Sequence, residues 1–247
     1  FTLVRRETER FLALYKQTVM PGLISTALYI LVFGKALGKK IDANGLEVNY
    51  TLYIIPGLIM MAVINHAYQN SSSSIMQAKF LKFLDDILIT PLSGLEIAFG
   101  YITGGVLRGV VTGLTIILMC FFIAPDFFVH NYTATILYIM LVSWTFSSIG
   151  VIVGVFAKSW DHIGVFTTFI FMPLTMLGGV FWSVAWLPHP WGLISKFNPV
   201  IELIFVASYK YTSSIAASTK LPPSRYCPNL ILSEAINLIL KSSVIVT

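Results

Sequence analysis

Charged residues are scarce in this sequence. Lys, Arg, Asp and Glu make up 11% of its 247 residues, whereas an ordinary soluble domain has about a quarter. Hydrophobic residues make up 56%, and the mean hydropathy is +0.81. So few charges cannot cover the surface of a soluble protein of this length. We therefore predict a single all-α polytopic membrane domain over residues 1–247.

Cysteines and catalytic motifs are also sparse. Cys120 lies in an apolar run and Cys227 in a polar loop, so we expect neither a disulfide nor a metal site. The patterns G-x-x-x-x-G-K-[ST], H-E-x-x-H, C-x-x-C and G-x-S-x-G do not occur. We predict a non-enzyme with no catalytic residue and no bound cofactor. The net charge of +5 comes from basic residues near the ends of apolar runs, which favours lipid headgroups over nucleic acid.

Six apolar runs are candidate membrane spans, each of which needs about 20 residues. They cover about residues 18–37, 50–69, 95–124, 134–156, 163–182 and 230–246. Glu234, Asn237 and Lys241 interrupt the last run, and each is costly at mid-membrane. The first run lacks an A-x-A-like cleavage end, so we expect it to be retained as a span.

Two charged segments flank or interrupt these runs. Residues 1–16 alternate charged and apolar side chains, which predicts an amphipathic helix with its polar face in water and its apolar face in the headgroup region. The alternative is a leader without fixed structure whose pattern is accidental. In residues 70–93, four serines are expected to end the preceding helix. A new helix over about 75–90 then lies parallel to the membrane, with Phe80 and Phe83 on one face and Lys82 and Asp86 on the other.

A re-entrant hairpin is predicted over about residues 186–207. After the fifth run the chain turns and becomes apolar again within too few residues to have crossed the membrane. The residues predicted to form its turns and an outer gate are Gly178, Gly179, Pro188, Trp191, Asn198, Pro199 and Glu202. Such a segment indicates a transporter or channel rather than a simple anchor.

The third run carries a stripe of small residues and one charge. Gly105, Gly109 and Gly113 recur every fourth residue, a spacing that lets a neighbouring helix approach closely, within one subunit or between two. Arg108 lies inside the run. Either it marks a functional site in the bundle, or it extends along its alkyl stem to the headgroups. The four basic residues in the first 16 place the N-terminus in the cytoplasm.

Several stretches together resemble the permease subunit of type-2 ABC exporters of the bacterial inner membrane. They are IIPGLIMMAVI (54–64), AKFLKFLDDILITPLS (78–93), GYITGGVLRG (100–109) and MPLTMLGGVF followed by LP and NP, and the resemblance covers about residues 1–206. It implies six spans with an outer re-entrant hairpin before the last. It also implies that the helix at 75–90 is a coupling helix docking on a separate ATPase, through Phe80, Lys82, Phe83, Asp85 and Asp86.

The same resemblance implies the assembly and the activity. Two ATPase subunits, which hold ATP-Mg, would join a homodimer of the permease in the inner membrane, among lipids and without nucleic acid. The substrate would be an amphiphile such as a drug, a lipid or a polysaccharide-linked lipid. Tyr53, Met60, Met61, Phe169 and Phe171 suit such a substrate, although the same residues fit core packing or lipid contact. The alternative, a self-contained secondary transporter or channel, requires paired carboxylates or broken helices at the midplane.

Overall fold

The computed structural model describes residues 2–13, 15–36, 41–43, 46–48, 50–124 and 132–177. The chain divides into two compact units, Phe1–Ser208 and Tyr209–Thr247, and all described residues belong to the first. The predicted hairpin at 186–207 and the sixth span at 230–246 lie outside the described residues. So do their named positions Gly178, Gly179, Pro188, Trp191, Asn198, Pro199 and Glu202.

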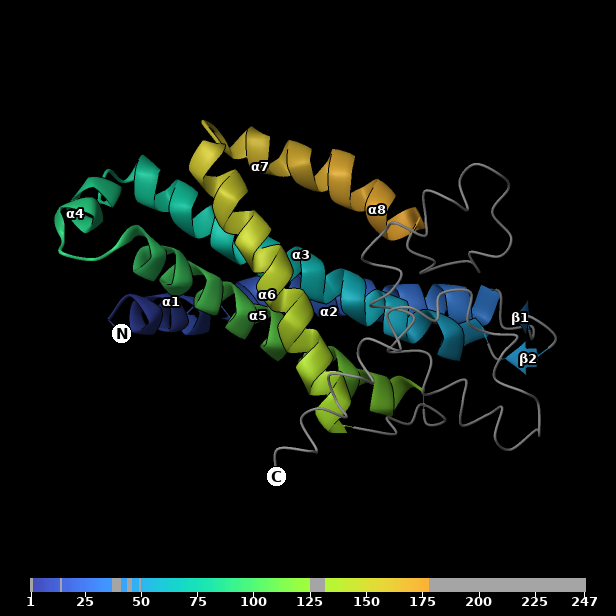
Figure 1. Cartoon of the computed structure of the whole chain (residues 1–247). Coiled ribbons are helices and arrows are strands. Elements are labelled where there is room, and N and C mark those ends of the chain that lie inside the picture. Colours follow the sequence, from blue (N-terminus) through green and yellow to red (C-terminus); the bar gives the residue numbers. More distant parts are fainter. Residues whose placement is uncertain are drawn as a thin grey trace, which may run out of the picture. The chain divides into compact units, whose positions relative to one another are not determined.

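Helices make up nearly all of the described structure (Figure 1). They are α1 (Thr2–Ala13), α2 (Tyr15–Ala36), α3 (Tyr50–Phe80), α4 (Leu84–Ile89), α5 (Gly94–Ile123), α6 (Tyr132–Phe156), α7 (Trp160–Phe166), the π-helical turn η1 (Thr167–Phe171) and α8 (Met172–Leu177). Between α2 and α3 lies one antiparallel pair of short strands, β1 (Ile41–Ala43) and β2 (Leu46–Val48). The predicted helical class is confirmed apart from this small hairpin.

Two described helices are long and apolar enough to cross a membrane. They are Gly94–Ile123 and the Thr135–Phe156 part of α6. A third candidate consists of α1 and α2 together, which meet at an angle of 57°. These findings are those expected of a membrane protein, and the number of six spans stays a prediction.

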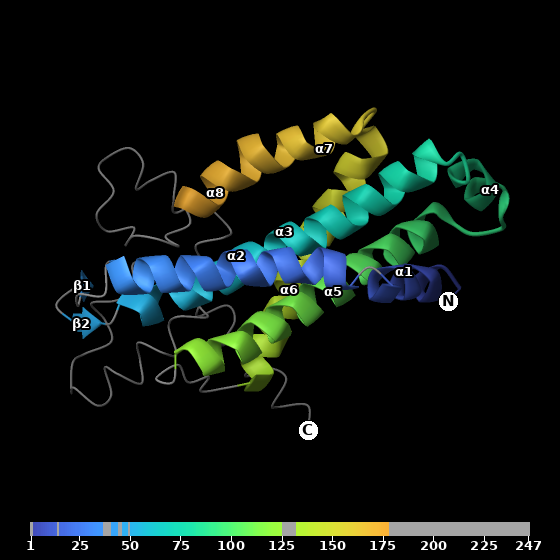
Figure 2. The ribbon, with the colours of Figure 1, turned by 180° about the vertical axis from the view of Figure 1, so that it is seen from behind.

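α3 is the central helix of the described bundle and packs mainly against α5 and α6, with α2 and α7 beside it (Figures 1 and 2). Val63, Ile64 and Tyr68 of α3 are fully buried. On the partner helices they meet a core that includes Ile116 of α5 and Ile139 of α6. Because lipid tails are as apolar as these side chains, close packing rather than hydrophobic transfer is the main attraction between such helices.

The prediction that the serines at 71–74 end a helix is wrong, because α3 continues through them to Phe80. Ser72 Oγ donates to the carbonyl oxygen of Tyr68 at 2.8 Å, and Ser73 Oγ donates to that of Asn70 at 3.2 Å. Serine hydroxyls compete with the helix when they bond non-helical backbone. Here they bond carbonyls of the preceding turn and leave the helix intact.

The predicted single helix at 75–90 is also wrong in its continuity. α3 ends at Phe80, Lys82 adopts a left-handed backbone with φ of +59°, and α4 begins only at Leu84. A left-handed residue redirects the chain, so Lys82 and Asp86 do not share one helical face. Met76 lies in the core, whereas Phe80 is 72% exposed. After α4, a capping box between Ser93 and Glu96 starts α5.

Candidate functional sites: a buried polar cluster and the α4 tip

Gly105, Gly109 and Gly113 of α5 face the other core helices of the same subunit. A Cβ on Gly105 would lie closer than 3.0 Å to the Ser71 and Ser147 hydroxyls, and 2.9 Å from the carbonyl oxygen of Ala67. A Cβ on Gly109 would meet Ser143 as closely, and one on Gly113 would lie 2.9 Å from Val63. The stripe therefore allows α5 to approach both α3 and α6 within one chain.

Hydroxyl groups connect the three helices in the space that the glycines leave. The Ser71 and Ser147 Oγ atoms are 2.6 Å apart. Ser71 also donates to the carbonyl oxygen of Tyr101 at 3.3 Å, and Ser147 donates to that of Ile102 at 2.9 Å. Small polar residues of this kind both permit close approach and bond across the helices.

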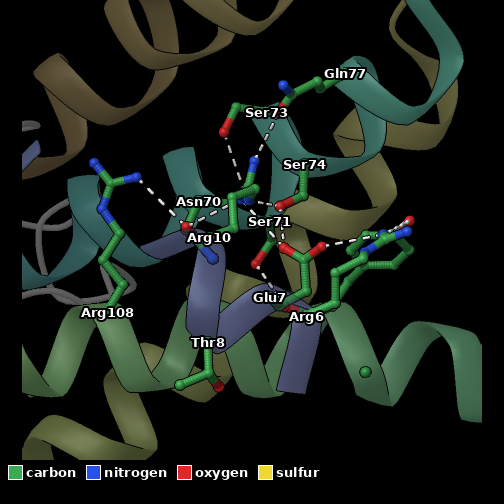
Figure 3. Close-up of polar contacts among 12 residues, drawn as sticks. Arg6, Glu7, Thr8, Arg10, Asn70, Ser71, Ser73, Ser74, Gln77 and Arg108 are labelled. Carbon is green, nitrogen blue, oxygen red and sulfur yellow. Dashed lines mark hydrogen bonds and ion pairs between the residues drawn. The ribbon is translucent and has the colours of Figure 1, made fainter. Parts of the chain in front are cut away.

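The N-terminal helix predicted at 1–16 is confirmed as α1, and Arg5, Arg6 and Glu9 of its polar face are exposed as predicted, but Glu7 and Arg10 turn toward the protein instead. Glu7 is 2% exposed, and it lies over Gly104 of α5. Figure 3 shows Glu7 and Arg10 pointing toward the serine-rich turns of α3. The amphipathic pattern could not reveal this because α3 presents a polar surface, which attracts the same side chains that water would.

Glu7 is held by hydrogen bonds and ion pairs (Figure 3). Ser74 Oγ donates to Glu7 Oε2 at 2.5 Å, and Arg10 Nη2 lies 3.2 Å from the same oxygen. Arg6 Nη2 is 3.2 Å from Oε1. Arg10 reaches further, donating to Ser74, to Gln77 Oε1 at 3.0 Å and to Asn70 Oδ1 at 3.3 Å. A buried carboxylate in this position is stable only while these partners remain.

Arg108 lies in the bundle interior, and its role as a functional site stays a prediction. Its side chain is 8% exposed. Nη1 donates to Asn70 Oδ1 at 3.5 Å, and Nη2 lies 3.3 Å from Nδ1 of His66. We define the polar cluster as Glu7, Arg10, His66, Asn70, Ser74 and Arg108. Within this cluster Asn70 Oδ1 accepts a hydrogen bond from both Arg10 and Arg108, as Figure 3 shows.

Lys79 makes an interhelical contact that the sequence analysis does not predict. Its ammonium donates to the carbonyl oxygens of Gly154 at 2.9 Å and Ala157 at 3.1 Å, and also to Val155. These are terminal carbonyls of α6, where a cation is favoured by the helix dipole. The only signal in the sequence is a lysine near the end of a long helix.

The predicted ATPase-contact residues gather at the turn between α3 and α5. We call residues 80–89 the α4 tip. α4 has no buried residue, and Asp85 and Asp86 are exposed in its first turn. Phe83 is partly covered by the Arg6 guanidinium, 4.9 Å above its ring. The large apolar side chains exposed at the tip are Phe80, Leu81, Leu88 and Ile89.

Met60, Phe169 and Phe171, three of the residues suggested as a substrate lining, do not share one surface. Met60 and Phe171 are buried in the core, where the Phe171 ring meets the Tyr68 ring edge-on at 4.7 Å. Phe169 is 74% exposed. Core packing therefore accounts for Met60 and Phe171. Among the described residues there is also no group of three His, Cys, Asp or Glu side chains that could hold a metal ion.

Comparison with known proteins decides the family. Residues 1–204 match the family described as "ABC-2 type transporter". This chain belongs to that family. It is 40% identical over 200 residues to the inner membrane transport permease YadH of Escherichia coli (strain K12), covering 81% of this chain and 77% of that protein. YadH of Shigella flexneri gives the same identity and coverage. No solved structure matches it significantly.

Family membership confirms the resemblance seen in the sequence. The chain is the membrane subunit of an ABC transporter, a multi-pass permease of the bacterial inner membrane type. The alternative of a self-contained secondary transporter or channel is therefore wrong. ABC-2 permeases normally pair with ABC ATPase subunits.

Proposed function

We propose that this chain is the permease of an ATP-driven exporter, with its N-terminus in the cytoplasm and six spans in each of two identical copies. Two separate ATPase subunits would hold ATP-Mg and drive it, and the substrate would be an amphiphile such as a drug, a lipid or a polysaccharide-linked lipid. The α4 tip is the observation that carries this proposal.

The composition of the tip suits a protein partner in water. Phe80 and Ile89 are 72% and 82% exposed, and exposed apolar groups in such density mark an interaction surface. Lys82, Asp85 and Asp86 stand among them, and charges of this kind exclude the hydrocarbon core as the medium. Apolar anchors ringed by charges are typical of a docking surface on a second protein.

The tip is also directly connected to two helices of the bundle. It joins the C-terminal end of α3 to the N-terminal end of α5, two helices of the core (Figure 1). In the proposed mechanism, closure of the ATPases on ATP pushes the tip, and α3 and α5 tilt together. The two permease copies would then open alternately toward the cytoplasm and the outer side.

Replacing Phe80 with Ala tests the docking role. Burying a phenylalanine side chain contributes about 1.5–3 kcal/mol, so we expect F80A to retain roughly a tenth or less of the ATPase that co-purifies with wild type. Phe122→Ala is the matched control, because Phe122 is 81% exposed on α5, far along the chain from the tip. The measurement is the ATPase recovered with tagged permease from detergent extracts, together with ATP hydrolysis. Equal recovery with both variants would refute the assignment.

The orientation is tested with a cysteine at Asp85, which is exposed on α4. In a chain with Cys120 and Cys227 changed to Ser, D85C should react with a membrane-impermeant maleimide in inside-out vesicles and not in intact cells. A cysteine at Asp42, in the loop beyond the first span, should show the reverse. Labelling of D85C from outside would place the N-terminus and the tip on the wrong side for the proposed mechanism.

A further inference from the structure

A pocket of about 530 Å³ lies between α3, α5 and the α7–η1 segment, next to the polar cluster. Its size is within the range of small-molecule sites. Its lining combines polar side chains with a larger share of apolar surface. Its lining includes Gln69 and Ser73 of α3, Arg108 of α5, Trp160 and Gly164 of α7, and Thr168 of η1.

The positive charge of Arg108 has no carboxylate partner among the described residues. Its two hydrogen bonds go to an amide oxygen and an imidazole, and its Nε is buried with no partner. Glu7, the carboxylate of the polar cluster, is already held by Arg6 and Arg10. A buried, uncompensated charge is costly, so an anion beside Arg108 would stabilise this arrangement.

We propose that this pocket binds the phosphate headgroup of an amphiphile, with Arg108 as the cation that holds it. A guanidinium fork matches phosphate geometry better than it matches a spherical anion. Gln69 and Thr168 add an amide and a hydroxyl to the same lining, and no carboxylate is among the lining residues described.

The surroundings of the pocket favour an anion that carries an apolar chain over a free anion. Val165 and Phe169, on the same α7–η1 segment, expose their apolar side chains. Trp160 lines the pocket and begins α7 directly after the turn at Lys158 and Ser159. Tryptophan at a span end marks headgroup depth. The phosphate would therefore lie at headgroup level, with its chain along the α7–η1 surface.

Two sources could supply this chemistry: a membrane phospholipid that stays bound, or the transported amphiphile itself. Binding of a phosphate headgroup in this pocket does not require that the chain exports anything. Its identification with the transported amphiphile rests on the proposed function. The probe for both is dodecyl phosphate, added to the purified chain in dodecyl maltoside. Bound adducts are counted by native mass spectrometry.

Three variants distinguish a loss of ligand binding from a loss of folding stability. Arg108→Gln removes the charge, and we expect a loss of affinity of tenfold or more, the size typical of a charge-assisted hydrogen bond. Gly164→Leu fills the pocket, since a Cβ on Gly164 meets nothing within 4 Å, and it should abolish binding without lowering the melting temperature. Gly94→Leu is the matched control, because a Cβ there also meets open space and Gly94 does not line the pocket.

Loss of binding in R108Q and G164L, with wild-type binding in G94L, supports the site. Wild-type binding in G164L, or binding of dodecyltrimethylammonium as tight as that of dodecyl phosphate, overturns it. In the complex with its ATPase subunits, dodecyl phosphate that stimulates ATP hydrolysis in wild type but not in G164L identifies the transported amphiphile. Binding without stimulation identifies a resident phospholipid, and in that case the export proposal is tested separately by F80A.

Discussion

Gly105→Leu should abolish recovery of folded protein. The substituted side chain would enter the space where Ser71, Ser147 and the backbone of Ala67 already stand within 3.0 Å of its first carbon. The two hydroxyls can rotate away, but the carbonyl oxygen of Ala67 belongs to α3 and moves only if the helix moves. The smaller change Gly105→Ala should destabilise by about 1–3 kcal/mol, the usual cost of overpacking. This cost exceeds the roughly 1 kcal/mol that alanine gains over glycine in a helix.

The measurement is the monodisperse fraction and the melting temperature of detergent-purified protein. Gly94→Leu provides the control, because the same side chain added there meets open space. We expect G94L to match wild type, G105A to melt lower and G105L to aggregate. If G105L were recovered as well as G94L, α5 would not be packed against α3 and α6 as closely as the structure has it.

Glu7→Ala should be nearly as damaging, although it lies on a short N-terminal helix. Removing the carboxylate leaves the Arg10 guanidinium and the Ser74 hydroxyl facing each other without their common acceptor. Breaking one side of a buried ion pair typically costs about 3–5 kcal/mol. Glu7→Gln should fall between E7A and wild type, because an amide oxygen can still accept from Ser74 but carries no charge.

Glu9 offers the matched control two residues away. It pairs with Arg5 at 2.8 Å, but both side chains are more than half exposed. Exposed pairs of this spacing contribute about 0.3–0.5 kcal/mol, so Glu9→Ala should leave the melting temperature almost unchanged. Equal melting temperatures for E7A and E9A would mean that α1 is not anchored through Glu7.

The sequence predicted those features that depend on local pattern. Long apolar runs located α5 and α6, the charged alternation of residues 1–16 located α1, and the charged turn before Pro91 located the tip with Phe80 and Asp86. The four-residue spacing of Gly105 and Gly109 indicated close packing, although it could not say whether the neighbour was in the same chain.

The features that the sequence could not predict depend on contacts with residues that are distant along the chain. Serine alone favours caps and turns, so the sequence predicts a helix end at Ser71 and Ser72. In the structure Ser71 meets Ser147 of α6, and Ser72 donates to the carbonyl oxygen of Tyr68 one turn back. In the same way, only the position of Asn70 and Ser74 on α3 shows that Glu7 and Arg10 of α1 face protein, whereas Arg5 and Glu9 face outward.

Lys79 gives the described helices a mechanical property. α3 has 31 residues and, at 1.5 Å per residue, is about 46 Å long. At the end nearest the tip, the Lys79 ammonium fastens it to the last carbonyls of α6. Further along, the Ser71–Ser147 contact fastens the same two helices again. Two attachment points oppose sliding and rolling of one helix on the other, so we expect α3 and α6 to move as one rigid unit.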